Sequence, residues 1–471
     1  MIRILFLNLA LVSAQFGPAV MMTLATPLRQ LRPYPTLLAK LGVMPVPTDF
    51  TPANSAAFAT AITNSAGGDT ITLTAGQTYT GPFTLKSGLT STVTIRSSGH
   101  ASLPGNGTRV TSGDRSNMAI IVCGNFNNQQ CFSTTGNDAD NWRLTGLDMR
   151  QANGTIQDPG MVQFGDSAET TAADTPNNIE LDHNWIEAAQ PGAVRGVYVN
   201  GRNINIHDNH ISGFRRDGIE CQAILLVGGP GPVTIDNNYL MAMGEVFLSG
   251  GTGTGILPGD LTFTRNYVDS PQKYNPWNPT AFDINDVEAT TNLACSLSST
   301  GTTVTCNSHG VPIFPNVGTR VIKLTSGAQS GEIRTVSKAT DANTLILETP
   351  FSVNQSGASA TLYRPWRGHK NSFELKYLAG TTNLIEGNVF DGTWTMGQDG
   401  AGLVLTVRTQ QGAVPAATIK NTTIQYNWFR RFNQFLRLLS PDDEGGGGVA
   451  MEDVVIKHNL IEPAYQFSGY G

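Results

Sequence analysis

One short pattern of apolar and polar positions recurs along the chain. In the stretch Ile179–Ile186, an apolar residue is followed two positions later by a second, three positions later by Asn, and then by another apolar residue. The Asn of this pattern returns at seven places: Asn184, Asn209, Asn238, Asn266, Asn388, Asn427 and Asn459. The first four are 25 to 29 residues apart, which indicates a coil of stacked strands, and the apolar alternation indicates strands with one buried face.

Each repeat has room for about three short strands at roughly 3.3 Å per residue. The pattern therefore predicts an all-β fold, a right-handed parallel β-helix in which three strands form each turn. The recurrent Asn suits a bend, because Asn tolerates a left-handed backbone and its amide can bond the coils above and below. We interpret these residues as a structural ladder rather than as ligands.

Two segments of the chain depart from this repeat. Thr51–Ser65 is rich in Ala and has apolar residues at helical spacing, so we expect a short N-terminal helix that caps the open end of the coil. Residues 290–364 contain no Asn of the ladder, alternate Thr and Val, and carry turn residues. They predict a small β module inserted between two parts of the coil, at 51–289 and 365–471. The chain stops soon after Asn459, so we expect the C-terminal part to be truncated.

The first residues have the composition of an export signal. Met1-Ile2-Arg3 precedes the apolar run Ile4–Ala14, which is too short to span a membrane. Residues 1–25 are therefore predicted to be a signal peptide and residues 26–50 a leader or linker. The alternative is an N-terminal helix that packs on the coil. Export predicts a protein that is secreted, periplasmic or exposed on the surface of a bacterium.

The five cysteines suit an exported protein. Cys123 and Cys131 are close in the sequence, as are Cys295 and Cys306, so each pair can close a local disulfide. Cys221 is left over, and we expect it to be a small buried apolar residue.

Composition narrows the class of partner. The 51 glycines and the 14% of charged residues suit many turns and a stacked β core. The formal net charge is −6 and no basic run occurs, which argues against a nucleic-acid partner. We expect a monomer without a membrane span.

Each turn of the predicted coil has a second strand beside the ladder strand. Equivalent side chains on adjacent turns lie about 4.8 Å apart and form columns. On Phe373–Lys376, alternation places Glu374 and Lys376 on the outside. The residues expected on this charged face are Glu220, Gln222, Glu245 at the start of its strand, Glu374, Lys376, Arg408 and, if Leu436 and Leu438 point inward, Arg437.

Carboxylates and cations on one rigid face suit the chemistry of acidic sugars. In β-elimination, a cation or a Ca²⁺ ion held by carboxylates neutralises the carboxylate of a uronate while a base removes the C5 proton. Hydrolysis instead needs two carboxylates that straddle the bond. A third interpretation is a solvated face of weak ion pairs.

A second column lies two residues before each ladder Asn. It mixes polar types, and we interpret it as solvated surface; its members are Asp182, His207, Asp236, Thr264, Glu386, Gln425 and Lys457. Four histidines lie in or near turns without a partner at a recognisable spacing: His183, His210, His369 and His458. The sequence therefore predicts no metal–histidine arrangement.

Several segments carry a family resemblance. The segments are G-D-T-I-T-L at 68–73, R-G-V-Y-V-N at 195–200, N-S-F-E-L-K at 371–376 and L-T-V-R-T-Q-Q at 405–411. They resemble secreted bacterial right-handed β-helix proteins of the pectin-lyase-like superfamily, in which polysaccharide lyases and glycoside hydrolases dominate. Of the polygalacturonase motifs only an isolated Asp442-Asp443 occurs. The opening segment is most similar to the alginate and chondroitin lyase branch, which uses a Lys and an Arg on neighbouring turns, usually with Ca²⁺.

The resemblance maps those two roles onto Lys376 and Arg408. The leading hypothesis is an exported protein that binds an acidic polysaccharide and cleaves it by β-elimination, with Lys376 as the base and Arg408 as the neutralising group. The residues expected to bind substrate are Glu220, Gln222, Glu245, Glu374 and Arg437, and the expected cofactor is either Ca²⁺ or none. The alternatives are hydrolysis by a Glu pair and an adhesin that binds through the insert and the exposed Tyr274 and Trp277.

Overall fold

The computed structural model describes most of the chain from residue 47 onward. The described ranges are 47–124, 129–134, 139–152, 159–188, 193–215, 220–251, 255–275, 281, 283, 288–309, 320–364, 370–394, 400–440 and 449–463. The predicted signal peptide, Trp277, His369 and Asp442-Asp443 lie outside these ranges. In the described ranges, no helix is long and apolar enough to cross a membrane.

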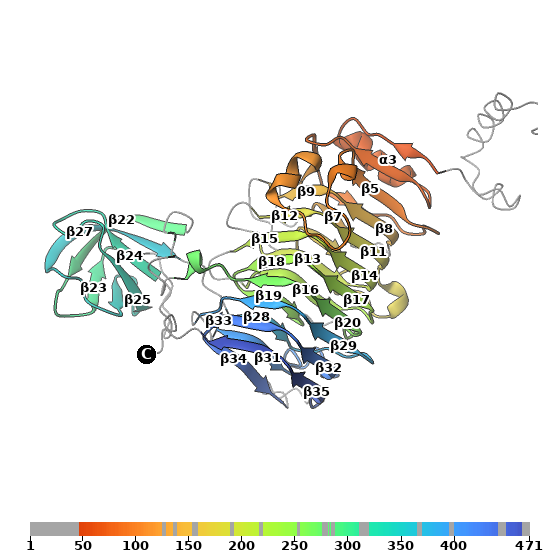
Figure 1. Cartoon of the computed structure of the whole chain (residues 1–471). Helices are drawn as coiled ribbons and strands as arrows, with labels where there is room; N and C mark the ends of the chain where they lie inside the picture. Colours follow the sequence, from red (N-terminus) through yellow and green to blue (C-terminus); the bar gives the residue numbers. More distant parts are fainter. Residues whose placement is uncertain are drawn as a thin grey trace, which may run out of the picture. The chain divides into compact units, whose positions relative to one another are not determined.

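Three long parallel sheets confirm the right-handed parallel β-helix (Figure 1). The ladder strands form sheet A, in the order β2 (Thr70–Leu73), β5 (Val93–Ser97), β8 (Asp140–Thr145), β11 (Asn177–Asp182), β14 (Arg202–His207), β17 (Val233–Asp236), β20 (Leu261–Thr264), β29 (Asn383–Glu386), β32 (Lys420–Gln425) and β35 (Glu452–Lys457). From β2 to β32, each of these strands is followed by a strand of sheet B and then by one of sheet C, and β35 is followed by β36 of sheet B.

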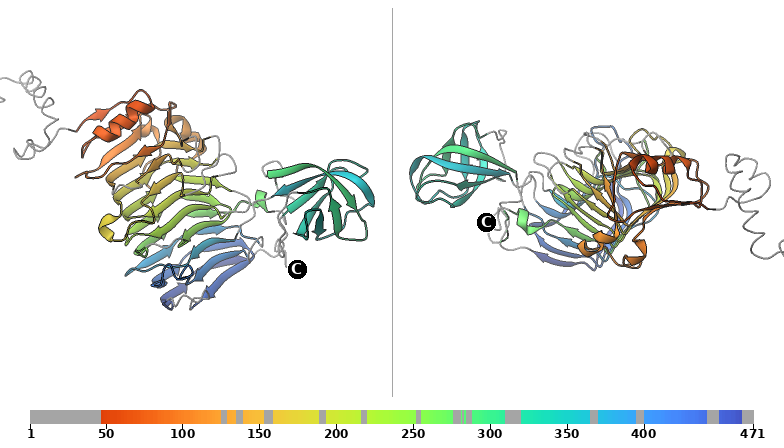
Figure 2. Two further views of the ribbon diagram at one scale, coloured as in Figure 1. Left: turned by 180° about the vertical axis from the view of Figure 1, so that it is seen from behind. Right: turned by 90° about the horizontal axis from the view of Figure 1, so that it is seen from above.

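Sheet B comprises β3 (Thr78–Thr80), β6 (Ala119–Val122), β9 (Leu147–Arg150), β12 (Trp185–Glu187), β15 (His210–Phe214), β18 (Tyr239–Ala242), β21 (Tyr267–Asp269), β30 (Val389–Asp391), β33 (Trp428–Phe432) and β36 (Leu460–Pro463). Sheet C comprises β4 (Phe83–Thr84), β7 (Phe132–Ser133), β10 (Val162–Phe164), β13 (Arg195–Asn200), β16 (Gln222–Gly228), β19 (Glu245–Ser249), β28 (Asn371–Leu375), β31 (Ala401–Thr406) and β34 (Gln434–Leu439). Figure 2 shows the successive turns stacked side by side.

The recurrent Asn residues form one continuous ladder, as predicted. The main-chain N–H of Asn184 donates to Asn209 Oδ1 at 2.9 Å, and the same bond links each ladder Asn to the next as far as Asn459. The step from Asn266 to Asn388 spans 122 residues at 2.8 Å, so the insertion leaves the ladder unbroken. The side-chain amides are therefore structural, because they satisfy buried main-chain groups.

The left-handed residue of each bend is the one before the Asn, which corrects the expectation for the Asn itself. Seven positions adopt positive φ there: His183, Asp208, Asn237, Arg265, Gly387, Tyr426 and His458. The ladder Asn keeps ordinary backbone angles and contributes its amide. At each bend, the first residue adopts the left-handed backbone and the Asn after it supplies the bonding amide.

The interior of the coil is apolar, and a helix packs at its N-terminal end. Stacked rings such as Phe247 and Phe373, with centroids 4.7 Å apart, continue the core from turn to turn. The predicted cap is α3 (Ser55–Asn64), which follows β1 (Asp49–Phe50). Asn54 caps the first turn through a bond from the Ala57 N–H, and α3 packs on β2, β3 and β4. Phe58 of α3 is fully buried.

The insert is a closed antiparallel barrel with its own core. Its order is β22 (Glu288–Leu297), β23 (Thr303–Cys306), β26 (Thr344–Leu347), β25 (Ile333–Ala339), β24 (Arg320–Leu324) and β27 (Gln355–Arg364). Leu345, Ala360 and Leu362 lie in that core. The structure thus confirms the inserted β module of the predicted fold.

Both predicted disulfides form. Cys123 is bonded to Cys131 in the coil and Cys295 to Cys306 in the barrel, between paired strands β22 and β23. Cys221 is buried and belongs to neither disulfide, as expected.

Candidate functional site

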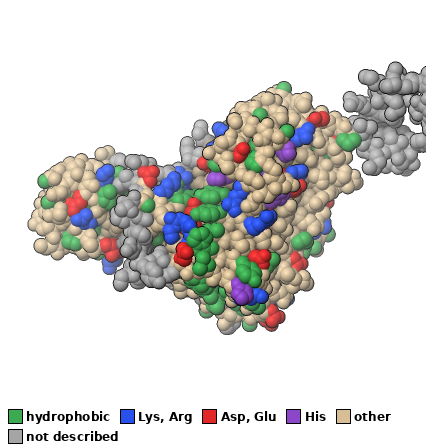
Figure 3. Space-filling model, viewed as in Figure 1, with side chains coloured by type: hydrophobic (Ala, Val, Ile, Leu, Met, Phe, Trp, Pro, Cys, Tyr) green, Lys and Arg blue, Asp and Glu red, His purple; other side chains and the backbone are tan. Residues whose placement is uncertain are grey.

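Charged side chains gather on parts of the coil rather than evenly over it. Figure 3 shows Lys and Arg side chains beside a strip of hydrophobic side chains on the face turned to the viewer. The predicted charged face belongs to sheet C, where the strands keep equivalent residues in register. Two further groups of interest lie on sheets A and B.

A row of polar side chains lies where the strands of sheet C begin. Arg195 and Gln222 are paired in the register of β13 and β16, and Arg195 Nε donates to Gln222 Oε1 at 2.8 Å. Gln222 Nε2 in turn donates to Glu245 Oε2 at 2.7 Å. The side chains of Gln222 and Glu245 are buried, so both act below the surface of this face.

Lys370 joins this row from the turn before β28, although the sequence analysis did not identify it. Its ammonium group contacts Glu220 Oε1, and it lies 3.3 Å from Glu245 Oε1. Glu220 is the more open partner, with 42% of its side chain exposed, whereas Glu245 is fully buried. The charge of one lysine therefore faces two carboxylates, one exposed to solvent and one buried. Its position just before a sheet C strand, like that of Glu220, was the signal that could have revealed it.

Glu374 and Lys376 lie farther along the same turn of the coil. Glu374 Oε2 accepts a bond of 2.9 Å from Asn371 Nδ2, and Lys376 Nζ lies 4.0 Å from Glu374 Oε1. Glu374 is mostly buried and Lys376 keeps 16% of its side chain exposed. The predicted alternation thus brings the two groups together, in a partly enclosed setting.

Lys376 and Arg408 occupy neighbouring turns. The Arg408 N–H donates to the Lys376 carbonyl oxygen at 3.1 Å, so the two residues are adjacent across the coil. Below Lys376 lies Gly250, at a φ of +132°, and a Cβ there would approach Lys376 Cβ to 2.7 Å. Glycine at 250 therefore leaves the space in which the Lys376 side chain begins.

Arg437 lies apart from this group. In the register of sheet C, Glu374 pairs with Val404 and Val404 pairs with Arg437, so Arg437 is two strands away from Glu374. It lies on β34, the end strand of the sheet, and is exposed. Arg437 was expected on the charged face only if Leu436 and Leu438 point inward, and Leu438 is 54% exposed. In the described part of the chain, β34 is the last strand of sheet C.

The electrostatics of the group oppose full ionisation. Burial, aided by the nearby charge of Glu374, raises the pKa of Glu245 above its usual range. Burial also lowers the pKa of Lys370 to about 8; Glu374 opposes this shift, and Lys376 and Arg408 add to it. The positive charge of Arg408 therefore acts on Lys370. We call the group Glu220, Gln222, Glu245, Lys370, Glu374, Lys376 and Arg408 the sheet C cluster.

The sheet C cluster does not fit the expected Ca²⁺ ion. Lysine ammonium groups already lie against Glu220, Glu245 and Glu374. Among the residues that the structure describes, the group of three His, Cys, Asp or Glu residues whose ligand atoms lie within 4.8 Å of one another is elsewhere, on sheet A. Calcium prefers six to eight oxygen ligands, which this cluster does not bring together.

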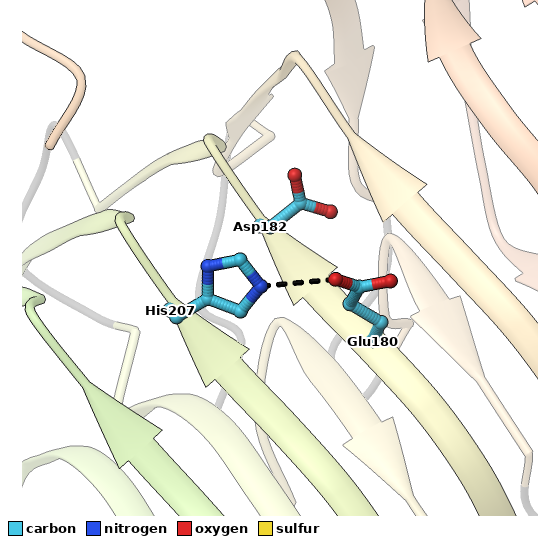
Figure 4. Close-up of side chains that lie close together, drawn as sticks. All are labelled: Glu180, Asp182 and His207. Atoms are coloured by element: carbon cyan, nitrogen blue, oxygen red, sulfur yellow. Dashed lines mark hydrogen bonds and ion pairs between the residues drawn. The ribbon is translucent and has the colours of Figure 1, made fainter. Parts of the chain in front are cut away.

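That other group is Glu180, Asp182 and His207. Figure 4 shows Glu180 and Asp182 reaching from β11 and His207 from the neighbouring β14. Asp182 is fully buried and His207 is mostly buried. The expectation that Asp182 and His207 belong to a solvated surface column is therefore wrong, because charged neighbours cover them.

The group is an ion network rather than a good metal site. Arg143 binds Asp182 with two bonds of 2.8 Å. His207 Nε2 lies 3.0 Å from Glu180 and Nδ1 lies 2.9 Å from Asp208, so both ring nitrogens face carboxylates. Burial disfavours the charged ring, but these two hydrogen bonds raise the pKa of His207 to about 9. A metal would need a neutral imidazole, and the chain supplies its own cations instead.

The aromatic pair of the adhesin hypothesis is not an exposed pair. Tyr274 is only 2% exposed and packs with Met241, Met243 and Trp394, so its predicted exposure is wrong. Trp277 lies outside the described residues.

Among the comparisons with known proteins, only the comparison with solved structures finds similar proteins. An alginate lyase from Paenibacillus sp. str. FPU-7 matches over 89% of this chain and 98% of its own, at 13% identity and a TM-score of 0.37. PfbA, a surface adhesin of Streptococcus pneumoniae, matches over 88% and 89% at 10% identity and 0.29. The A-module of the Azotobacter vinelandii mannuronan C-5 epimerase AlgE6 matches over 88% and 94% at 11% identity and 0.21. No protein-family model and no curated protein sequence matches the chain. Such low similarity carries no information on activity, which has to be inferred from the residues themselves.

Proposed function

We propose that this protein binds an acidic polysaccharide on sheet C and cleaves it by β-elimination, outside the cytoplasm of a bacterium. The observation that carries the proposal is the adjacency of Lys376 and Arg408 on neighbouring turns, within the sheet C cluster. A uronate carboxylate placed over Arg408 would have its charge neutralised, which makes the C5 proton easier to remove. Lys376 would then be positioned to accept that proton.

The bond changes balance without a further reactant. The C5–H bond breaks and its proton passes to the Lys376 amine. The electron pair forms the C4–C5 double bond as the C4–O bond breaks. The leaving oxygen takes a proton from the Lys376 ammonium group or from water. These reaction steps need no Ca²⁺ ion, because Arg408 supplies the neutralising charge.

Lys370 is the positioning residue of this scheme. Its contacts with Glu220 and Glu245 offset two negative charges that would otherwise repel an anionic sugar. Gln222 and Asn371 hold Glu245 and Glu374 in turn. Arg437 lies two strands from Glu374, and we assign it to a more distant sugar unit of the same chain.

The test is ultraviolet absorbance of the unsaturated uronate end, measured with a panel of uronate polysaccharides, with and without Ca²⁺. The proposal expects absorbance to rise with one glycan, and Lys376→Met to abolish the rise while the protein stays folded. Lys457→Met, on the exposed end of β35, is the matched control and should keep full activity. An active Lys376→Met variant would rule out the assigned base.

The same measurement separates the alternatives. Hydrolysis by a Glu pair would shorten the glycan with saturated ends and no absorbance. The burial of Glu245 disfavours it, because a fully buried carboxylate cannot straddle a sugar bond. An adhesin would bind glycan and leave its length unchanged.

A further inference from the structure

Two carboxylates and an amide meet at a tight bend where two strands of sheet C end. Gly165 follows β10 and lies against Asn200, the last residue of the paired strand β13. The bend continues through Asp166 and Glu169 toward β11. Asn200 Nδ2 donates to the main-chain oxygen of Asp166 and, at 3.0 Å, to Glu169 Oε2. The side chain of Asn200 therefore points into the bend.

The side-chain oxygen of Asn200 is buried without a hydrogen-bond donor. Asn200 is fully buried, and its Oδ1 makes no hydrogen bond to any residue that the structure describes. Turning the amide over would place this oxygen against Glu169 Oε2 and the Asp166 carbonyl oxygen, so the orientation of the amide is fixed. Because buried side-chain oxygens almost always have a partner, this one indicates a ligand that oxygen can bind.

The two carboxylates of the bend lie close together. The Asp166 N–H donates to both carboxylate oxygens of Glu169, at 2.8 Å and 2.9 Å, and the Ala168 N–H donates to Asp166 Oδ1 at 2.6 Å. Burial raises the pKa of Glu169 to about 7 although the main-chain bond opposes this shift, and the nearby charge of Asp166 adds to it. Within the described ranges, no lysine or arginine pairs with either carboxylate. A bound cation would therefore stabilise this pair.

The bend is closely packed on its inner side and open on its outer side. Gly165 has a φ of +74°, and a Cβ there would lie 2.3 Å from the Asn200 carbonyl oxygen and 3.1 Å from Glu169 Oε1. Glycine therefore lets the bend close around these oxygens. Asp166 and Glu169 are only half-buried, so solvent reaches the outer side of the bend. An ion can enter from this side and keep part of its water shell.

We infer that Asp166, Glu169 and Asn200 bind one Ca²⁺ ion, through the two carboxylates and Asn200 Oδ1. Every ligand atom is an oxygen, which suits an ion that takes six to eight oxygens from carboxylates, amide carbonyls and water. The ion ties the connection between β10 and β11 to the end of β13. The site is distinct from the sheet C cluster, since β13 lies three strands before β28 in sheet C. The proposed cleavage does not depend on it.

The test is calorimetric titration of the full chain with CaCl₂, after metal has been removed with EDTA. The expected result is one site with a Kd of about 10⁻⁴–10⁻³ M, because three protein ligands leave much of the shell to water. Mg²⁺ should bind at least about tenfold more weakly, since it gives up its water less readily. Ca²⁺ should also raise the midpoint of thermal unfolding, because it binds the folded chain. A titration without heat and an unchanged midpoint would overturn the inference.

Two variants of the bend locate the ion. Glu169→Gln and Asp166→Asn should each weaken Ca²⁺ binding about tenfold or more, because each removes one negative ligand. In EDTA, Glu169→Gln should unfold close to the native midpoint, since Gln keeps an oxygen that accepts the Asp166 N–H. Glu452→Gln, at the exposed start of β35, is the matched control and should bind Ca²⁺ as the native chain does.

Glu180→Gln, on sheet A, separates this site from the ion network of Glu180, Asp182 and His207. If Glu180→Gln removes Ca²⁺ binding and Glu169→Gln does not, the ion is held on sheet A and the inference is wrong. Native affinity in both Glu169→Gln and Asp166→Asn would also overturn it. These measurements use no glycan, so their outcome does not depend on the proposed lyase activity.

Discussion

The main-chain N–H of Arg408 donates a hydrogen bond of 3.1 Å to the carbonyl oxygen of Lys376. This bond joins the two residues across neighbouring turns of the coil, although 31 residues separate them in the sequence. Because a parallel sheet holds adjacent strands about 4.8 Å apart, the two side chains start from a fixed separation. The proposed reaction requires a base and a neutralising cation that are held at a fixed separation, and these two residues supply them.

Gly250→Ala should impair activity through Lys376. A Cβ at position 250 would lie 2.7 Å from Lys376 Cβ, so the lysine has to move. We expect cleavage to fall about 10–100-fold, since small displacements of a reacting group are costly. Gly251→Ala is the control, because its φ is also positive but its Cβ would meet only Leu248 and Leu225 at 3.5 Å or more. Equal losses in both variants would mean backbone strain, and not the contact with Lys376.

Lys370→Met should raise KM more than it lowers kcat. Without the ammonium group, Glu220 and Glu245 are uncompensated and repel an anionic glycan. The folded-state pKa of Lys370 is lowered to about 8, so the native enzyme loses this charge as pH rises through 8. We therefore expect KM of the native enzyme to rise above pH 8 and KM of Lys370→Met to be high and flat. Steady-state kinetics from pH 6 to 9.5 measure this; a native KM that does not change would contradict the role.

His207 should make stability depend on pH. Its folded-state pKa is raised to about 9 from 6.5, so the folded protein binds the extra proton between these values. The stabilisation is complete below pH 6.5 and is lost as pH rises to about 9. It should be of the order of 1–2 kcal/mol once solvent screening is allowed for. Urea unfolding at several pH values measures the loss.

His207→Gln should flatten that pH dependence between 6.5 and 9. His100→Gln is the control, because burial lowers the pKa of His100 and its titration lies below this window. If both variants keep the native slope, another group causes it.

Asn238→Ala should be among the more destabilising changes in the coil. Asn238 Nδ2 donates to the Ile206 carbonyl at 2.9 Å and to Asn266 Oδ1 at 3.0 Å, and its Oδ1 accepts the Asn209 N–H. Removing the buried amide leaves these partners without their hydrogen bonds, which should lower the free energy of unfolding by about 2–3 kcal/mol. Asn459→Ala, at the partly exposed end of the ladder, should cost less than about 1 kcal/mol. Similar losses at both positions in urea unfolding would contradict a ladder whose effect depends on burial.

The amino-acid sequence by itself determined the coil. The spacing of apolar residues and Asn, from Asn184 to Asn459, specifies three strands per turn, since each turn has to bury one apolar face and satisfy one bend. The inserted barrel could be predicted because residues 290–364 lack this pattern. Proximity in sequence was enough to pair Cys123 with Cys131. Alternation also placed Glu374 and Lys376 side by side.

Only the tertiary structure decided which charges meet and which are buried. Lys370 contacts Glu220 across 150 residues, and His207 meets Glu180 across 27, because stacking of the turns sets these distances. Tyr274 looked exposed in a turn-rich segment, yet it is buried against Met243 and Trp394. Periodicity states on which side of a strand a residue lies. It does not state what covers that side, because loops and neighbouring turns from distant parts of the chain determine the cover.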